Sequence, residues 1–511
     1  MSASGGTVVD YWMVGFTGHR KISDPEKIGG VVSRELESLS ERIAGELAAV
    51  SSVASGGDTL FAEEAIKLGI PWVAILPFPR EEFAKDFEPA DWERAKQCIS
   101  KAMIEEIWSP TPDRPGAYHD VGIKTVDECD ILFAVWDGGP SGGKGGTADI
   151  VEYARRRRKP LVWIHAGDGS VTKEHIDENH LRDPLFDRLL ALPDMEIPGP
   201  ELDGLDYLFR KLDAAASAHI PRVRSLETRI VLFNSVAAFI AAFATAMHYH
   251  TLDFVMLTTL LICYTWYLMA RLHFPKARHK FVQARLAAEV CRSLRATRDF
   301  PDRLTDLYRS FIPESEHMMR SLLVTRDVER ARSRKGVAEF NLADFRERYL
   351  EGRIRDQHRY YRKHRIHAMP RARRYAWTAL IASSAAVLAT VILAVIGLRA
   401  TGFDPFPGSY EFLMRHFYGS RESIPVAAPD SKALALLSIT APLIASFFTA
   451  LLATNEYGRR SGRYREMEQL LSAADLRLTN ATTPRAIKRV VVETEAALLS
   501  EAYQWYYHAG L

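Results

Sequence analysis

The chain has 511 residues, of which 47% are hydrophobic and 25% charged, and its formal net charge is +2. This length exceeds what one hydrophobic core supports, so we expect two to four structural units. The four cysteines lie far apart without metal-binding spacing, and we expect neither a disulfide framework nor a metal site. The N-terminus lacks the basic and apolar segments of a signal peptide, so we expect the first 220 residues to stay in the cytoplasm.

The first 165 residues alternate short apolar segments with helical ones. The pattern predicts strands at 11–16, 52–54, 72–76, 106–108, 131–136 and 161–164. It predicts helices at 25–50, 59–68, 81–103, 118–128 and 146–156. Such alternation is typical of an α/β domain with a doubly wound parallel sheet and helices on both faces.

Three glycine-rich turns follow the first, second and fifth predicted strands, and they meet at one edge of such a sheet. Glycine lets backbone N–H groups approach an anion, and the start of a helix favours negative charge. We therefore expect a nucleotide or nucleotide-derived ligand, and no cofactor, although neither a P-loop nor a GxGxxG motif is present. The candidate ligand-binding residues are Gly15, Thr17, Gly18, His19, Arg20, Ser55, Gly56, Gly57, Asp58, Lys144, Gly145, Gly146, Thr147 and Asp149. The basic run 155–159 has no interleaved aromatic residues, so we expect no nucleic-acid partner.

The segments GFTGHR, ASGGDTLFAEEA and GGKGGTADIVEYA, in this order, resemble the SLOG superfamily over about residues 8–170. This Rossmann-like group includes the LOG phosphoribohydrolases, which combine a PGGxGTxxE loop with an upstream Arg to cleave a nucleotide N-glycosidic bond. Here Asp149 lies near the acidic position, but the segment 118–122 offers no Arg. The resemblance thus implies a sensor rather than a hydrolase. If the domain is an enzyme, His119 and Asp149 are the candidate catalytic residues.

Four apolar segments, 230–247, 252–269, 375–398 and 433–453, are long enough to cross a bilayer as helices. A buried core helix is the alternative for each, but four such segments are hard to bury in one chain. The stretch between Arg271 and Tyr375 carries 27 Lys and Arg, whereas the link 248–251 carries none. This bias predicts a multi-pass protein of the inner membrane with both termini in the cytoplasm. Charged residues are absent from the interiors of these segments, which argues against a solute transporter.

The region 345–510 contains a Gln-x-x-Tyr-Tyr helix (Gln357, Tyr360, Tyr361), two apolar segments and an aromatic terminal helix. It resembles the SLATT family, two-span effector modules often paired with SLOG domains in prokaryotic defence systems. The first pair of apolar segments is either a diverged repeat of the second or an unrelated hairpin, and the sequence leaves both readings open.

These observations predict a ligand-binding domain followed by an all-α membrane domain with four transmembrane helices and long cytoplasmic helices. The expected units are 1–170 (SLOG-like), 171–229 (connector), 230–300 (first hairpin), 301–374 (cytoplasmic helices) and 375–511 (second hairpin, SLATT-like). Our leading hypothesis is a homo-oligomeric antiviral defence effector that senses a nucleotide-derived second messenger and permeabilises or depolarises the membrane. The alternative is a membrane-anchored nucleotide N-glycosidase.

Overall fold

The computed structural model describes residues 8–140, 143, 145–177, 181–192, 204–247, 253–309, 316–334, 341–400, 431–455 and 457–510. The chain divides into two compact units, which are described separately below. The first consists of Met1–Ala216, Gln283–Arg353 and Arg477–His508. The second consists of Ser217–Val282, Ile354–Leu476 and Ala509–Leu511.

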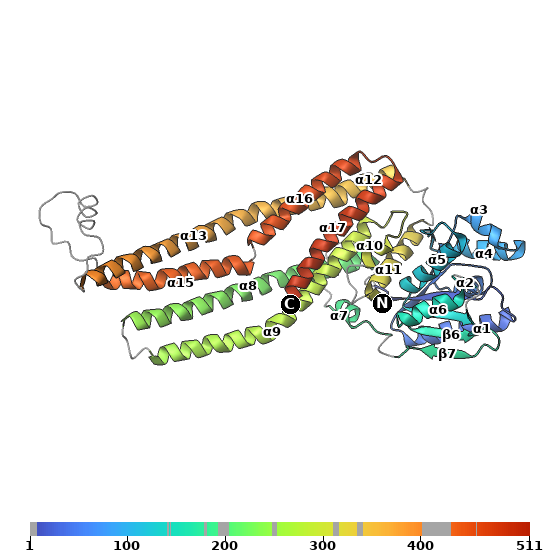
Figure 1. Ribbon diagram of the computed structural model, residues 1–511, viewed down its shortest axis with the longest axis horizontal. Helices are drawn as coiled ribbons and strands as arrows, with labels where there is room; N and C mark the ends of the chain where they lie inside the picture. Colours follow the sequence, from blue (N-terminus) through green and yellow to red (C-terminus); the bar gives the residue numbers. More distant parts are fainter. Residues whose placement is uncertain are drawn as a thin grey trace, which may run out of the picture. The chain divides into compact units, whose positions relative to one another are not determined.

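A seven-stranded sheet is the centre of the first unit (Figure 1). Its strands are β1 (Tyr11–Gly18), β2 (Glu46–Ser51), β3 (Trp72–Leu76), β4 (Ile104–Ile107), β5 (Ile131–Trp136), β6 (Leu161–His165) and β7 (Val171–Glu174). They are arranged in the order β4-β3-β2-β1-β5-β6-β7, and all neighbours are parallel except β6 and β7. The predicted parallel sheet is therefore confirmed, and its strand order reverses between β1 and β5.

Helices cover both faces of this sheet, as predicted. They are α1 (Pro25–Arg42), α2 (Gly57–Lys67), α3 (Arg80–Phe83), α4 (Pro89–Lys101), α5 (Arg114–Glu128) and α6 (Thr147–Arg156). Side chains alternate along a strand. Trp12, Val14 and Phe16 of β1 join one core with α1, α2 and α4. Tyr11 and Met13 join the opposite core with α5 and α6.

The second strand lies earlier than predicted. We expected a helix over 25–50 and a strand at 52–54, but α1 ends at Arg42 and β2 occupies Glu46–Ser51. The segment Leu47–Val50 contains two alanines, which favour a helix in isolation. Here it is buried on both faces and paired with β1 and β3, and these sheet contacts outweigh the local preference.

Other boundaries also differ. The predicted helix 81–103 is split into α3 and α4, which begins at Pro89, because proline favours the first turn of a new helix. α5 begins at Arg114, four residues before the predicted start, where the Asp113 carboxylate accepts a hydrogen bond from the Gly116 N–H at 2.9 Å. β7 was not predicted, and it pairs antiparallel with β6 at the sheet edge.

Helices from later in the chain belong to the same unit as the sheet. They include α7 (Pro184–Leu190), α10 (Thr305–Arg309), α11 (Glu316–Arg334), α12 (Leu342–Tyr349) and most of α17 (Pro484–Gly510). α11 packs against β1, where the Tyr11 N–H donates to Ser321 Oγ at 2.9 Å. Val324 and Val328 join the core beneath α5 and α6. Part of the segment 301–374, expected to form a separate region, thus completes one face of the sheet.

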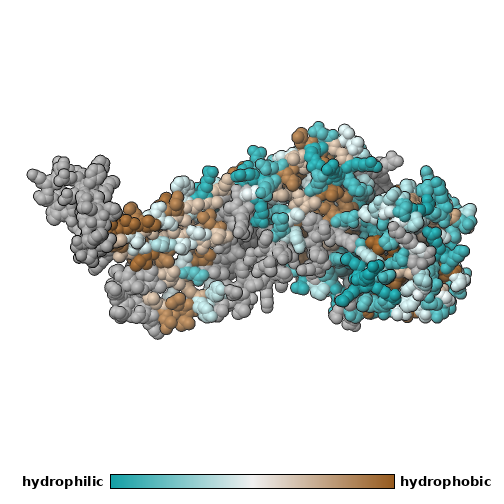
Figure 2. Space-filling model, viewed as in Figure 1, coloured by the Kyte–Doolittle hydropathy of each residue, from teal (hydrophilic) through white to brown (hydrophobic). Residues whose placement is uncertain are grey.

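The second unit contains long apolar helices. They are the later part of α8 (Gly204–Met247), the earlier part of α9 (Asp253–Ala296), α13 (Asp356–Ala400), α15 (Ser431–Asn455) and most of α16 (Tyr457–Thr479). α13 and α15 lie side by side (Figure 1), with the Tyr375 and Phe448 rings 5.7 Å apart. Hydrophobic side chains gather on the exposed surface of this pair (Figure 2).

Two helical segments of the described chain, within 342–396 and 434–453, are long and apolar enough to cross a membrane by length and composition. They correspond to the predicted segments 375–398 and 433–453. The predicted segments 230–247 and 252–269 lie in α8 and α9. Their apolar stretches among the described residues, Val231–Ile240 and Val255–Tyr264, are shorter. The structure therefore supports two of the four predicted spans on these criteria.

Candidate functional site

A cavity of about 620 Å³ opens at the carboxyl ends of β1 and β5, where the strand order reverses. At this point the connections on either side of an open sheet leave in opposite directions, which creates a crevice suited to a ligand. Eight of the predicted ligand-binding residues line the cavity: Thr17, Gly18, His19, Arg20, Asp58, Gly145, Gly146 and Thr147. The three glycine-rich turns thus converge as expected from the sheet topology.

Five of the other predicted ligand-binding residues are described and do not line the cavity. Gly15 lies within β1, where an added Cβ would be 2.8 Å from Cys129 Sγ. Ser55 donates its hydroxyl hydrogen to Asp91 at 3.0 Å. The Asp149 carboxylate accepts a hydrogen bond from the Gly145 N–H at 3.0 Å and so fixes the turn before α6. Gly56 and Gly57 also lie off the cavity lining, and Lys144 lies outside the described residues.

The turns after β1 and β2 contact each other directly. The Gly57 N–H donates to the His19 carbonyl at 2.9 Å. Gly56 has a φ of +93°, and a Cβ there would lie 2.2 Å from the Arg20 carbonyl oxygen. Glycine is therefore required at 56 for the two turns to approach each other. Gly56 thereby holds together two turns whose residues Gly18, Arg20 and Asp58 line the cavity.

Arg20 gives the cavity a cationic group. Its side chain is exposed and lies 5.0 Å above the Tyr118 ring. Among the described residues it has no ion-pair partner. The first residues of α6, Thr147 and Ala148, line the same cavity. The first N–H groups of a helix have no intrahelical acceptor and attract anions. The cavity therefore combines two features that favour a negatively charged ligand.

Sequence reasoning missed a second arginine in the cavity wall. Arg114, the first residue of α5, lines the cavity. It pairs with Asp86 at 2.9 Å and with Glu82 at 2.7 Å. Tyr118 also donates to Asp86, at 2.6 Å. The sequence Asp113-Arg114-Pro115 is a helix-start signal that places Arg114 on this helix, whereas no sequence pattern indicated Asp86.

Asp58 is the most buried acidic group in the cavity wall, with 6% of its surface exposed. It lies in the first turn of α2 and accepts hydrogen bonds from the Ser52 hydroxyl and the Gly18 N–H. Burial raises the pKa of Asp58 to about 7, although these hydrogen bonds and the Arg20 charge oppose the rise. A carboxyl group that titrates near neutral pH inside a cavity is suited to proton exchange with a ligand.

The raised pKa of Asp58 predicts a pH-dependent stability. Because its folded-state pKa exceeds its ordinary value of 3.8, the carboxyl contributes stability that is fully present below about pH 4. That contribution is lost as the pH rises through 7. Between pH 4 and pH 8, wild type should lose up to about 4 kcal/mol of unfolding free energy that Asp58→Asn does not lose. The stability of Asp58→Asn relative to wild type therefore rises over this range. Urea denaturation at a series of pH values checks this, and parallel profiles for the two proteins would contradict it.

The candidate catalytic residues do not form a reactive pair at the cavity. His119 Nδ1 lies 3.9 Å from Asp120 Oδ1, and neither His119 nor Asp149 lines the cavity. His19 does line it, with Nε2 3.0 Å from Asp137 Oδ1. Two interactions hold the pKa of Asp137 below its usual range. The larger effect comes from the hydrogen bond that the Gly139 N–H donates to its carboxylate, and the next from the contact with His19.

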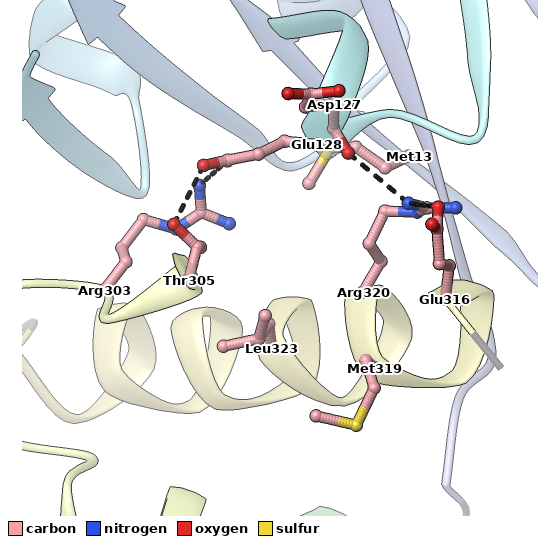
Figure 3. Close-up of a pocket in the computed structure, with 9 residues that line it drawn as sticks. All are labelled: Met13, Asp127, Glu128, Arg303, Thr305, Glu316, Met319, Arg320 and Leu323. Atoms are coloured by element: carbon pink, nitrogen blue, oxygen red, sulfur yellow. Dashed lines mark hydrogen bonds and ion pairs between the residues drawn. The ribbon is translucent and has the colours of Figure 1, made fainter. Parts of the chain in front are cut away.

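A second, much smaller cavity of about 30 Å³ lies between α5, α10 and α11 (Figure 3). Figure 3 shows Arg303 and Thr305 directed at Glu128, and Arg320 directed at Glu316. This volume is close to that of one water molecule. It is therefore too small for a nucleotide, and its charged lining residues already pair with one another.

No group of three or more His, Cys, Asp or Glu side chains with metal-binding geometry occurs in the described part of the chain. The sequence matches no protein-family model, and a search of the curated proteins finds no relative.

Proposed function

We propose that this chain is a membrane effector controlled by a nucleotide-derived ligand. In this proposal the SLOG-like sheet domain binds the ligand in its cavity. The SLATT-like apolar helices then permeabilise or depolarise the inner membrane as part of a prokaryotic antiviral defence system. The observation that carries the proposal is the presence, in one chain, of an anion-favouring cavity and two helical segments suited to a bilayer.

The cavity supports a phosphate-bearing ligand. Arg20 has a guanidinium group that matches phosphate oxygens, and the first turn of α6, at Thr147 and Ala148, offers backbone N–H groups. The Tyr118 ring, also in the wall, offers a surface on which a base can stack. The volume of about 620 Å³ is in the usual range for small-molecule sites.

Chain continuity supports a link between ligand and membrane. α8 and α9 each have residues in both compact units, so each helix joins the unit that holds the sheet to the unit that holds the apolar helices. We propose that α8 and α9 also span the membrane, which gives four spans with both termini in the cytoplasm. A homo-oligomer then lines the permeation path, since one chain offers few helices for a pore.

The proposal is tested in cells that express the chain and are infected with phages. Arg20→Glu is expected to weaken ligand binding about tenfold or more, because it replaces a charge-assisted contact with repulsion. Infection should therefore depolarise cells expressing wild type but not Arg20→Glu, as followed with a potential-sensitive dye. Arg34→Glu, an exposed substitution on α1, is the matched control. Equal depolarisation by wild type and Arg20→Glu would contradict ligand control through this cavity.

A nucleotide N-glycosidase is the second candidate function. It is favoured by Asp58, whose raised pKa near 7 in the cavity wall suits a general acid or base. Purified protein incubated with nucleoside monophosphates or NAD distinguishes the two functions. Release of free base that is lost in Asp58→Asn would establish the enzyme, whereas ligand binding without turnover supports the effector.

A further inference from the structure

The exposed face of α13 changes from basic to apolar at one point along the helix. Arg373, Trp377, Leu380, Val387 and Val391 follow one another by three, four or seven residues and so share a face. All five are exposed, and Trp377 retains 62% of its surface. A neighbouring row repeats the pattern, with Arg374 followed by the exposed Ile381 and Leu388. Both rows have arginine before Trp377 and only apolar residues after it.

The opposite face of α13 is the one that packs within the second unit. Ala386 and Ala389 are buried, and the Tyr375 ring contacts Phe448 of α15. Nearer the start of α13, Arg365 forms an ion pair with Glu468 of α16 at 2.7 Å. The rows that contain Arg373 and Arg374 therefore point away from both α15 and α16.

The charge of this segment is of one sign. Seven Lys and Arg lie between 359 and 374, and the sequence has no Asp or Glu from 357 to 403. Arg373 and Arg374 have no ion-pair partner in the described part of the chain, although both are exposed. If the apolar face of α13 lies in a bilayer, this pair of guanidinium groups lies at the level of the headgroups, where an anionic partner is available.

We infer that Arg373 and Arg374 bind the anionic headgroups of membrane phospholipids. This inference rests on the membrane placement of α13 in the proposed function. Trp377 then lies at the interface between hydrocarbon and headgroups, where tryptophan is preferred. The two arginines lie one turn further out, at the level of the phosphates, with which guanidinium groups form paired hydrogen bonds. An anionic leaflet attracts basic residues next to a span and so favours this position of the helix.

The test uses the full chain in nanodiscs of equal phosphatidylcholine and phosphatidylglycerol, with bromine on the acyl chains of one lipid at a time. Bromine quenches nearby tryptophan, and the difference between each protein and its Trp377→Phe form isolates the signal of Trp377. We expect brominated phosphatidylglycerol to quench Trp377 at least about fivefold more than brominated phosphatidylcholine. Arg373→Gln/Arg374→Gln should make the two lipids equal.

Arg362→Gln/Lys363→Gln is the matched control, because it removes the same charge from exposed positions of the same helix. These residues lie about 16 Å further along the axis, beyond the headgroups, and the lipid preference should persist. Equal quenching by both lipids in wild type, or equal loss of preference in both double variants, would overturn the inference. If neither lipid quenches Trp377, the membrane placement of α13 fails, and with it the proposed function.

Discussion

Replacing Arg303 with methionine is expected to lower the free energy of unfolding of the full chain by about 3–5 kcal/mol. Arg303 retains 2% of its surface, and its nearest carboxylate partners are Glu128 on α5 and Asp327 on α11, with Glu106 of β4 at 3.9 Å. The distance to Asp327 is 2.8 Å. Methionine fills a similar volume but leaves both carboxylates buried without this cation, which is the costly way to break a buried ion pair.

The electrostatics of Glu128 point in the same direction. Burial alone would raise the pKa of Glu128, but the charges of Arg303 and Lys124 outweigh burial and lower that pKa to about 2. Without Arg303, only Lys124, at 2.6 Å, remains as a direct ion-pair partner among the described residues. Part of the cost should therefore disappear at low pH, where Glu128 becomes protonated.

Urea denaturation in detergent, followed by circular dichroism, measures the change. Arg348→Met is the matched control, because the pair between Arg348 and Asp299 is exposed at 64% and 44%. Exposed pairs contribute at most about 1 kcal/mol. If Arg303→Met costs no more than this control, the ion pairs that join α11 to α5 do not hold α11 on the sheet in solution.

The packing of α11 on the sheet shows where prediction from sequence ends. The strand pattern alone indicated a parallel sheet and placed the glycine-rich turns at one edge, because strands buried on both faces read as continuous apolar segments. α11 contains Arg320, Arg326 and Asp327, which in a sequence are typical of a solvated helix. In the structure all three pair within the first unit. Arg320 pairs with Asp130, 190 residues earlier, and no local pattern reveals a buried charge with so distant a partner.

The candidate site, like the packing of α11, was predicted only in part from the sequence. Thr17, Arg20, Asp58 and Thr147 line the cavity, as expected from their positions near the ends of strands that the apolar segments predicted approximately. Gly15 lies inside β1, within the predicted strand 11–16, and outside the cavity lining. Arg114 was missed because the start of α5 was placed four residues late. The raised pKa of Asp58 follows from its burial beneath the turn after β1, which sequence spacing does not show.

Replacing Glu495 with alanine is expected to lower the free energy of unfolding by at least about 3–5 kcal/mol. Glu495 of α17 is fully buried and pairs with Arg353, which is 1% exposed, through two hydrogen bonds of 2.9 and 2.7 Å. It also accepts a hydrogen bond from the Tyr349 hydroxyl at 2.7 Å. Alanine removes all three bonds and leaves the Arg353 guanidinium with Glu289, at 2.9 Å, as its remaining direct partner among the described residues.

The Glu495–Arg353 pair lies at a π-helical turn, so its loss should also change the backbone there. Arg353 lies in a π-helical turn, Leu350–Arg355, between α12 and α13, and the first compact unit ends at Arg353 in this part of the chain. Such turns persist only where other contacts stabilise them. Loss of Glu495 should therefore increase amide hydrogen exchange within Leu350–Arg355 more than within α1.

Glu493→Gln is the control, because Glu493 pairs with Arg477 at the surface, with 44% and 48% exposed. Equal exchange in Glu495→Ala and Glu493→Gln would show that the buried pair does not stabilise the π-helical turn from which α13 begins.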